Sequence, residues 1–285
     1  MGYRLTLSDI AYILDGFYGG WSLREISTNF RRRFHLPISP STILRRTAYW
    51  IKTMDEAVAY FVETGKPVRI HGRKKQLGFK LHFGDFWEID EIYLSVKDTN
   101  LPLIVVRDLK TAFIIVAVLA ETATYKAIKQ ALVFAKASAR KYPAEIRGDG
   151  YPAYPRAVRA VFRGRTDFAL HKRVGRMGMN QSIEGTFSTL RSWLKKRRGL
   201  HSMNLSPIIV KGLILYHNFV RVSEVLGGKT PAEVALHWQP IDPTVGGWYF
   251  LLGLAKYYKR TVLSCKNQNK DCDDGYQFSL DSFLV

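Results

Sequence analysis

The spacing of apolar residues in the N-terminal part of the chain predicts three helices. Apolar side chains recur at helical intervals over 7–18, and two glycines end that segment. A second helix is expected from Ser22, with apolar residues on one side and arginines on the other. Ser39 is the expected N-cap and Pro40 the first residue of a third helix. This pattern is typical of a helix-turn-helix, whose third helix enters the DNA major groove; a small helical cap on the main core is the alternative.

From Phe86 onward the period of the hydrophobic pattern changes to that of strands. Three strand-like runs cover 86–96, 101–108 and 112–120, and turn-prone residues 97–100 separate the first two. The remaining pattern predicts, in order, a helix at 122–140, a strand at 145–147, a helix at 151–161, a strand at 168–171 and a helix within 180–201. Three antiparallel strands followed by alternating helices and strands predict a mixed α/β sheet with flanking helices. This order is compatible with a ribonuclease H-like fold.

The 285 residues are enough for two domains and a tail. We expect an all-α helix-turn-helix domain over 1–64, a basic linker over 65–80, an α/β domain over 81–240 and a C-terminal tail over 241–285. The linker contains the run HGRKK, in which Arg73 and Lys74 are expected to contact phosphate. A solvated charge run is the alternative for this segment.

The charge balance points to a polyanionic partner. The chain has 43 Lys and Arg against 24 Asp and Glu, which gives a net charge of +19. Such an excess favours nucleic acid over a membrane surface, although a merely basic soluble protein would carry it too. Arg45 and Arg46, near the start of the third predicted helix, are therefore expected to contact DNA.

The sequence favours a cytoplasmic, nucleoid-associated protein with no membrane partner. The start of the chain lacks the basic region and long apolar stretch of a signal peptide. Apolar runs such as 112–120 are too short to span a bilayer. The two cysteines, Cys265 and Cys272, match no common zinc-binding spacing.

Asp90 is an acid inside an apolar strand, FWEIDEIYLSV. The alternation of the strand sets Asp90 on the same face as Ile92 and Leu94. Burying an ionised carboxylate there is costly unless a cation compensates its charge. Asp90 is therefore expected either to pair with an arginine or to bind a metal ion.

Two further acids stand where a metal site could form. Asp149 lies between two glycines, which fits a tight turn but also fits the strand ends where α/β folds bind ligands. Glu184 lies beside the apolar stripe of a helix and heads a row with Arg191 and Lys195; a surface pairing of charges is the alternative. Carboxylates on a strand, a strand end and a helix can converge on divalent metal.

Such a constellation has a specific chemistry. Two divalent cations roughly 3.5–4 Å apart activate water and stabilise the attacking and leaving oxygens of a phosphodiester displacement. Magnesium prefers hard oxygen ligands, with manganese as the alternative ion, and the histidine or cysteine clusters that favour zinc are missing. The sequence contains no P-loop, dinucleotide fingerprint or GxSxG motif, which argues against nucleotide hydrolysis, hydride transfer and serine-ester chemistry.

Four segments in their order resemble the insertion-sequence transposases of the DDE superfamily, whose catalytic domain is similar to retroviral integrase. They are WEIDEIYLSVKD, GDGYPAYPRAV, NQSIEGTFSTLR and YHNFVRVSEVLGGKTPAEVA, within about residues 86–235. The resemblance implies that Asp90, Asp149 and Glu184 are the catalytic, metal-binding acids and that Asn180 supports the glutamate. It also implies that basic residues after the glutamate hold DNA, namely Arg191, Lys195 and Lys196.

The resemblance implies a transposase that binds double-stranded DNA at terminal inverted repeats and at a target. Two magnesium ions would support strand cleavage and then strand transfer, and synapsis of two ends would need a homodimer or a higher oligomer. The chain departs from the family pattern after Arg221, where Val222 and Ser223 stand instead of a Pro-His pair, and again beyond about Gly253. The alternatives are an inactive, transposase-derived DNA-binding protein and a nuclease that cuts without joining.

Overall fold

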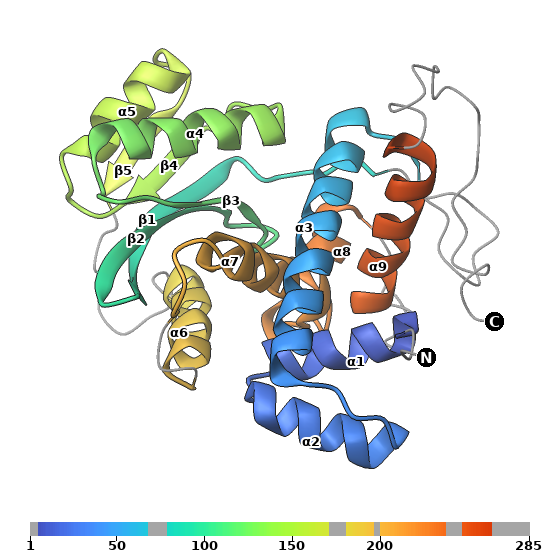
Figure 1. Ribbon diagram of the computed structural model, residues 1–285. Helices are drawn as coiled ribbons and strands as arrows, with labels where there is room; N and C mark the ends of the chain where they lie inside the picture. The colour runs from blue at the N-terminus through green and yellow to red at the C-terminus, as the bar shows by residue number, and fades with distance from the viewer. Residues whose placement is uncertain (1–4, 68–78, 171–180, 197–199, 238–246, 264–285) are drawn as a thin grey trace. The chain divides into compact units, whose positions relative to one another are not determined.

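The computed structural model describes residues 5–67, 79–170, 181–196, 200–237 and 247–263 (Figure 1). The chain separates into two compact units. The helical unit consists of residues 1–80, 208–221 and 238–285. The α/β unit consists of residues 81–207 and 222–237. No helix in the described ranges is both long and apolar enough to cross a membrane.

The three predicted N-terminal helices are confirmed as α1 (Leu7–Tyr18), α2 (Leu23–Phe34) and α3 (Pro40–Thr64). Side-chain caps explain where they begin. Ser22 and Ser39 accept hydrogen bonds from backbone N–H groups three residues later, which satisfies donors that a helix start leaves unpaired. Gly65, with a φ of 66°, ends α3 in the left-handed region that glycine adopts without a steric penalty.

The helical unit also contains the C-terminal helix α9 (Trp248–Tyr257), which packs against α1 and α3. Aromatic rings form much of this contact: Phe79 lies 5.5 Å from Phe61 and 6.4 Å from Phe250, measured between ring centroids. The predicted tail therefore contributes core residues to the helical unit. Two π-helical segments, Tyr216–Val220 and Tyr258–Leu263, belong to the same unit.

The α/β unit is built on a five-stranded sheet in the order β3-β2-β1-β4-β5. Its strands are β1 (Phe86–Val96), β2 (Thr99–Asp108), β3 (Ile114–Leu119), β4 (Glu145–Gly148) and β5 (Asp167–Leu170). The first three strands pair antiparallel, whereas β4 joins β1 and β5 joins β4 in parallel. This mixed order confirms the predicted ribonuclease H-like sheet.

Five helical segments of the described residues belong to the α/β unit. They are α4 (Tyr125–Ala139), α5 (Ala153–Phe162), α6 (Gln181–Lys196), η2 (Glu224–Leu226) and α8 (Pro231–Ala235). The helix α7 (Ser206–Leu215) begins at the end of the segment 81–207 and belongs mostly to the helical unit. The predicted turn over 97–100 is shorter than expected. Lys97 and Asp98 both have positive φ, 44° and 65°, so they alone turn the chain and β2 begins at Thr99.

The two faces of the sheet carry different helices, as Figure 1 shows: α4 and α5 lie on one face and α6 on the other. Trp87 and Ile89 of β1 are fully buried in the core that α4 and α5 cover. The alternate residues Ile92 and Leu94 are also buried, and Val96 forms a bridge to Leu200, just beyond α6. The strand that contains Asp90 is thus covered on both sides.

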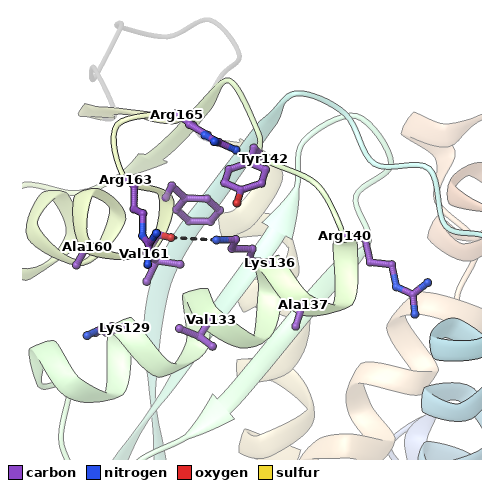
Figure 2. A pocket seen from close by; sticks show the side chains of 11 residues that line it. Lys129, Val133, Lys136, Ala137, Arg140, Tyr142, Ala160, Val161, Arg163 and Arg165 are labelled. Atoms are coloured by element: carbon purple, nitrogen blue, oxygen red, sulfur yellow. Dashed lines mark hydrogen bonds between the residues drawn. The ribbon is translucent and has the colours of Figure 1, made fainter.

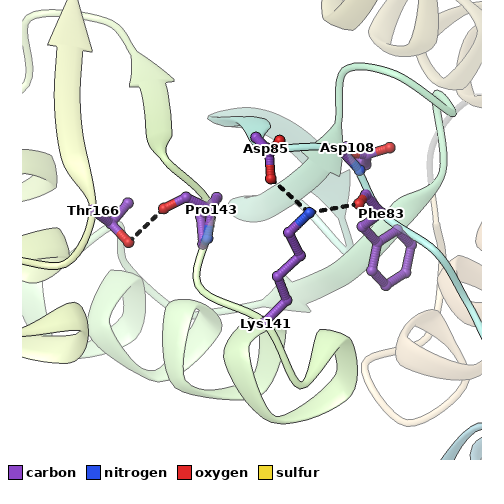
Figure 3. Close-up of polar contacts among 7 residues, drawn as sticks. Phe83, Asp85, Asp108, Lys141, Pro143 and Thr166 are labelled. Atoms are coloured by element: carbon purple, nitrogen blue, oxygen red, sulfur yellow. Dashed lines mark hydrogen bonds and ion pairs between the residues drawn. The ribbon is translucent and has the colours of Figure 1, made fainter.

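Polar contacts hold the start of β1 in place (Figure 3). The Lys141 ammonium lies 2.7 Å from Asp85 and donates to the Phe83 carbonyl at 2.9 Å, and this pairing lowers the pKa of Asp85. The buried Asp108 carboxylate accepts hydrogen bonds from the Gly84 N–H at 2.8 Å and from both the N–H and hydroxyl of Thr111. These contacts fix where β1 enters the sheet and therefore where Asp90 lies.

Candidate active site

Asp90 lies in the middle of β1 and is half-buried. It stands opposite Val105 of β2, which holds it in the antiparallel register. One oxygen, Oδ1, accepts the Glu91 N–H at 2.8 Å. Alternation puts the side chain on the face of Ile92 and Leu94, as the sequence predicts.

Asp149 follows the last residue of β4. In the parallel pair, Glu88 of β1 stands beside Arg147 of β4. Continued by two residues, this register sets Asp149 beside Asp90. Asp149 is exposed, and its Oδ1 accepts the Tyr151 N–H at 2.8 Å. Asp149 therefore stabilises the turn after β4, which is one of the two roles expected from the sequence. Its carboxylate keeps further acceptor sites for a metal ion.

Gly148 lets β4 end close to its neighbours. A Cβ at this position would lie 3.2 Å from ring atoms of Phe168 and Tyr154 and 3.3 Å from Ile89. Such contacts are tighter than ordinary van der Waals separation, so a larger residue would push β4 away from β1 or α5. Gly148 therefore allows β1 and β4 to approach closely. The spacing of Asp90 and Asp149 depends on this approach.

Glu184 falls in the first turn of α6, and its side chain lies outside the described residues, as does Asn180. The described part of α6 contacts β1, on the face that carries Asp90. Three residues of its predicted apolar stripe are buried: Phe187, Leu190 and Leu194. The α6 backbone therefore has the expected position, and the convergence of all three acids stays a prediction.

Glu91 is an ionisable group at this site that sequence reasoning missed. It points to the opposite face from Asp90, where the hydroxyl of the fully buried Tyr154 donates a hydrogen bond to its carboxylate. Burial, together with the negative charges of Asp149 and Asp90, raises the pKa of Glu91 to about 7. Both acids therefore act electrostatically on one group. The alternation of side chains along β1 could have predicted which face of the sheet Glu91 points to, but not its hydrogen bond with Tyr154.

The donor groups suit a hard cation. Asp90 and Asp149 offer carboxylate oxygens, the ligands that magnesium and manganese prefer. After burial, which is the larger cause, their negative charges help to raise the pKa of Glu91, and a bound cation would relieve this repulsion. Across the residues that the structure describes, no three His, Cys, Asp or Glu side chains form a metal-binding group. Glu184, whose side chain lies outside the described residues, is the residue predicted to complete the site.

The predicted DNA-binding residues are placed only in part. Arg191 and Lys195 are exposed on α6, with the Arg191 guanidinium 5.9 Å from the Phe187 ring centroid. Arg45 and Arg46 are exposed near the start of α3. Arg73, Lys74 and the side chain of Lys196 lie outside the described residues.

Residues 84–223, about half of the chain, match the family model for a DDE domain. This segment is a DDE domain. It contains Asp90, Asp149 and Glu184, and the resemblance to insertion-sequence transposases of the DDE superfamily is confirmed. The matched domain supports a transposition-related nuclease or integrase function.

Solved structures with some likeness to the chain are viral integrases. The HTLV-2 integrase catalytic core domain, in complex with magnesium in a dimeric form, is 18% identical over 55% of this chain and 97% of its own, with a TM-score of 0.41. The catalytic core domain of BIV integrase is 12% identical over 54% of this chain and 95% of its own, with a TM-score of 0.39. No curated protein matches the sequence.

The raised pKa of Glu91 predicts how stability depends on pH in the metal-free protein. An unfolded chain releases the Glu91 proton near pH 4.5, whereas the folded DDE domain holds it up to about pH 7. The folded state therefore binds more protons in this window, so the free energy of unfolding should fall as pH rises from 4.5 to 7. Glu91→Gln should remove part of this slope, measured by urea denaturation in EDTA. Glu121→Gln, at an exposed position, is the control, and an unchanged slope in Glu91→Gln would contradict the assignment.

Proposed function

We propose that the DDE domain cuts DNA strands and joins the exposed 3′ ends to target DNA in a metal-dependent reaction. The observation that carries this proposal is the pairing of β1 with β4, because its register, continued by two residues beyond Glu88 and Arg147, would set Asp90 beside Asp149. Two carboxylates at neighbouring strands of a DDE domain, both acting on Glu91, form an acidic site suited to a divalent cation.

In this proposal each acid has a role as a metal ligand. Asp90 and Asp149 would hold the ions from the sheet, and Glu184 would complete the site from α6. Two magnesium ions, or manganese in their place, would supply activation of water and of the 3′-hydroxyl and would stabilise the leaving oxygen. Asn180 is proposed to support Glu184 from the segment just before α6.

Residues around the acids have positioning tasks. Tyr154 holds the Glu91 carboxylate on the α5 face, away from the face that carries Asp90. Arg191 and Lys195, exposed on α6, are proposed to bind DNA phosphates next to the cut strand, together with Lys196. In this arrangement the cationic side chains would contact DNA, and the carboxylates would contact the metal ions.

The other parts of the chain are proposed to select DNA. The segment 1–64 would recognise terminal inverted repeats as a helix-turn-helix, with Arg45 and Arg46 on the recognition helix. The linker over 65–80, including Arg73 and Lys74, would follow the phosphate backbone to the catalytic domain over 81–240. Because one active site cannot hold two transposon ends, synapsis calls for a homodimer or a higher oligomer. Binding to chromosomal DNA would place such a protein in the cytoplasm, at the nucleoid.

The acid-to-amide variants test the catalytic proposal. Asp90→Asn, Asp149→Asn and Glu184→Gln should each lower magnesium-dependent cleavage of an end-containing duplex on the order of 10³-fold, because each removes a charged metal ligand. Cleavage and joining are read on a denaturing gel. Asp98→Asn, in the exposed β1–β2 turn, is the matched control and should keep full activity.

The products of the same reaction separate the proposal from its rivals. Joined strands support transposition, whereas nicked strands alone indicate a nuclease. DNA binding with no metal-dependent cutting by the unaltered protein would indicate a transposase-derived DNA-binding protein. Retained cleavage in all three acid variants would reject the assignment of the acids.

The helix-turn-helix proposal predicts a separate effect on binding. Replacing both Arg45 and Arg46 with alanine should weaken binding to the flanking inverted repeats at least about tenfold, since a good contact of arginine with a base edge is worth roughly 1–3 kcal/mol. Fluorescence anisotropy in EDTA measures this affinity without cleavage. An Arg24→Ala, Lys52→Ala protein loses the same charge at exposed positions of α2 and α3. Equal weakening in the two proteins would argue against a recognition role for Arg45 and Arg46.

A further inference from the structure

A second basic feature of the α/β unit lies between α4 and α5. These helices bound a pocket of about 640 Å³, a size typical of ligand-binding clefts. Of the residues that line it, five are basic and none is acidic: Lys129, Lys136, Arg140, Arg163 and Arg165. Its remaining lining is apolar or aromatic, so the pocket offers positive charge above an apolar floor.

Tyr142 lies at the centre of this charge (Figure 2). The Lys136 ammonium is 4.5 Å and the Arg165 guanidinium carbon 5.1 Å from its ring centroid. A hydrogen bond from Lys136, aided by the charges of Arg165 and Arg163, lowers the pKa of the Tyr142 phenol. The phenol thus responds to an excess of positive charge that no lining carboxylate neutralises.

Helix ends account for part of this charge. Arg140 and Arg163 are the C-caps of α4 and α5, where a cation is favoured by the helix dipole. Lys136 has a structural contact too, because its ammonium donates to the Val161 carbonyl at 3.2 Å and ties α4 to α5. Lys129 lies in the second turn of α4, and Arg165 lies beyond α5. Neither one is explained by a helix end.

The pocket is separated from the proposed active site by the sheet. The buried faces of α4 and α5 pack on Trp87 and Ile89, whereas Asp90 points to the face that α6 covers. A DNA strand at the carboxylates would therefore not occupy the groove between α4 and α5. Any phosphate bound there belongs to another stretch of nucleic acid.

We propose that the groove between α4 and α5 binds the phosphate backbone of a second DNA segment, distinct from the one that is cut. Several cations along one groove match successive phosphates, and the apolar floor at Val133 and Ala137 suits the deoxyribose edges between them. This inference rests on the proposed DNA-processing function and adds a surface that holds DNA without taking part in the chemistry.

The test replaces three of the lining cations and leaves Lys136, which ties α4 to α5, in place. Lys129, Arg163 and Arg165 are exposed, and Figure 2 shows Arg140 pointing away from Lys136. In the full chain with EDTA, Lys129→Ala, Arg163→Ala and Arg165→Ala together should weaken duplex DNA binding roughly tenfold or more. Between about 50 and 200 mM salt, the affinity should also fall less steeply with salt concentration, as expected when up to about three phosphate contacts are lost.

The matched control removes the same charge elsewhere in the α/β unit. Lys97, Lys110 and Lys126 are exposed, and none of them lines the pocket. Their triple alanine variant should bind DNA close to the level of the unaltered protein. Equal losses in the two triple variants would mean that only net charge matters, which would overturn the inference.

Two further arms complete the experiment. Inorganic phosphate and pyrophosphate should displace DNA poorly at matched phosphate concentration, because one small anion meets only some of the cations. Displacement as effective as that by unlabelled duplex would assign the groove to a small anion and overturn the inference. If the triple variant loses the circular dichroism signal of the folded protein, Lys129→Ala alone serves as the test. Its DNA affinity should fall about threefold, and an unchanged affinity would contradict the proposal.

The outcome is distinguishable from failure of the proposed function. Full DNA affinity in the pocket variant, combined with loss of cutting in Asp90→Asn, would overturn the second DNA surface and leave the active site intact. Weakened binding in the pocket variant supports the surface even where no strand is cut, because the measurement is made without divalent metal.

Discussion

The parallel pairing of β1 with β4 is the constraint on which the candidate site depends. It brings two acids from distant parts of the sequence close to Glu91, whose carboxylate both of them repel. The effect is visible on Glu91, whose pKa is raised to about 7 by burial and by the charges of Asp149 and Asp90. Gly148 permits this closeness, and the contacts of Lys141 and Asp108 fix the entry of β1. The fold thus maintains a local excess of negative charge that a divalent cation would offset.

The same sheet separates two kinds of electrostatic surface. One face carries Asp90 and is covered by α6, with its exposed cations Arg191 and Lys195. The other face is covered by α4 and α5, whose outer groove collects basic residues around Tyr142. A protein with a net charge of +19 thus concentrates acids at the candidate catalytic site and places cations around the DDE domain. This division suits a reaction in which DNA must be held at more than one point.

Much of the fold could be predicted because its signals are local. Ser39 and Pro40 marked the start of α3 through capping chemistry, the pattern of apolar residues and arginines marked α2, and alternation in 86–96 predicted the whole of β1. The hairpin turn was predicted too long because Lys97 and Asp98 adopt positive φ without a glycine to signal it. Glu91 was missed for a different reason. Its environment depends on Tyr154, which lies 63 positions along the chain and meets Glu91 only in the folded sheet. The basic groove likewise joins residues of two helices that no sequence motif connects.

The central claim is that Asp90 and Asp149 share bound metal with Glu184. A crystal structure of the unaltered protein grown with manganese tests it most directly, because anomalous scattering locates the ion independently of any activity. The account predicts an anomalous peak within coordination distance of carboxylate oxygens of Asp90 and Asp149, with Glu184 of α6 as a further ligand. A peak elsewhere, or the three carboxylates pointing to separate parts of the molecule with manganese present, would contradict it.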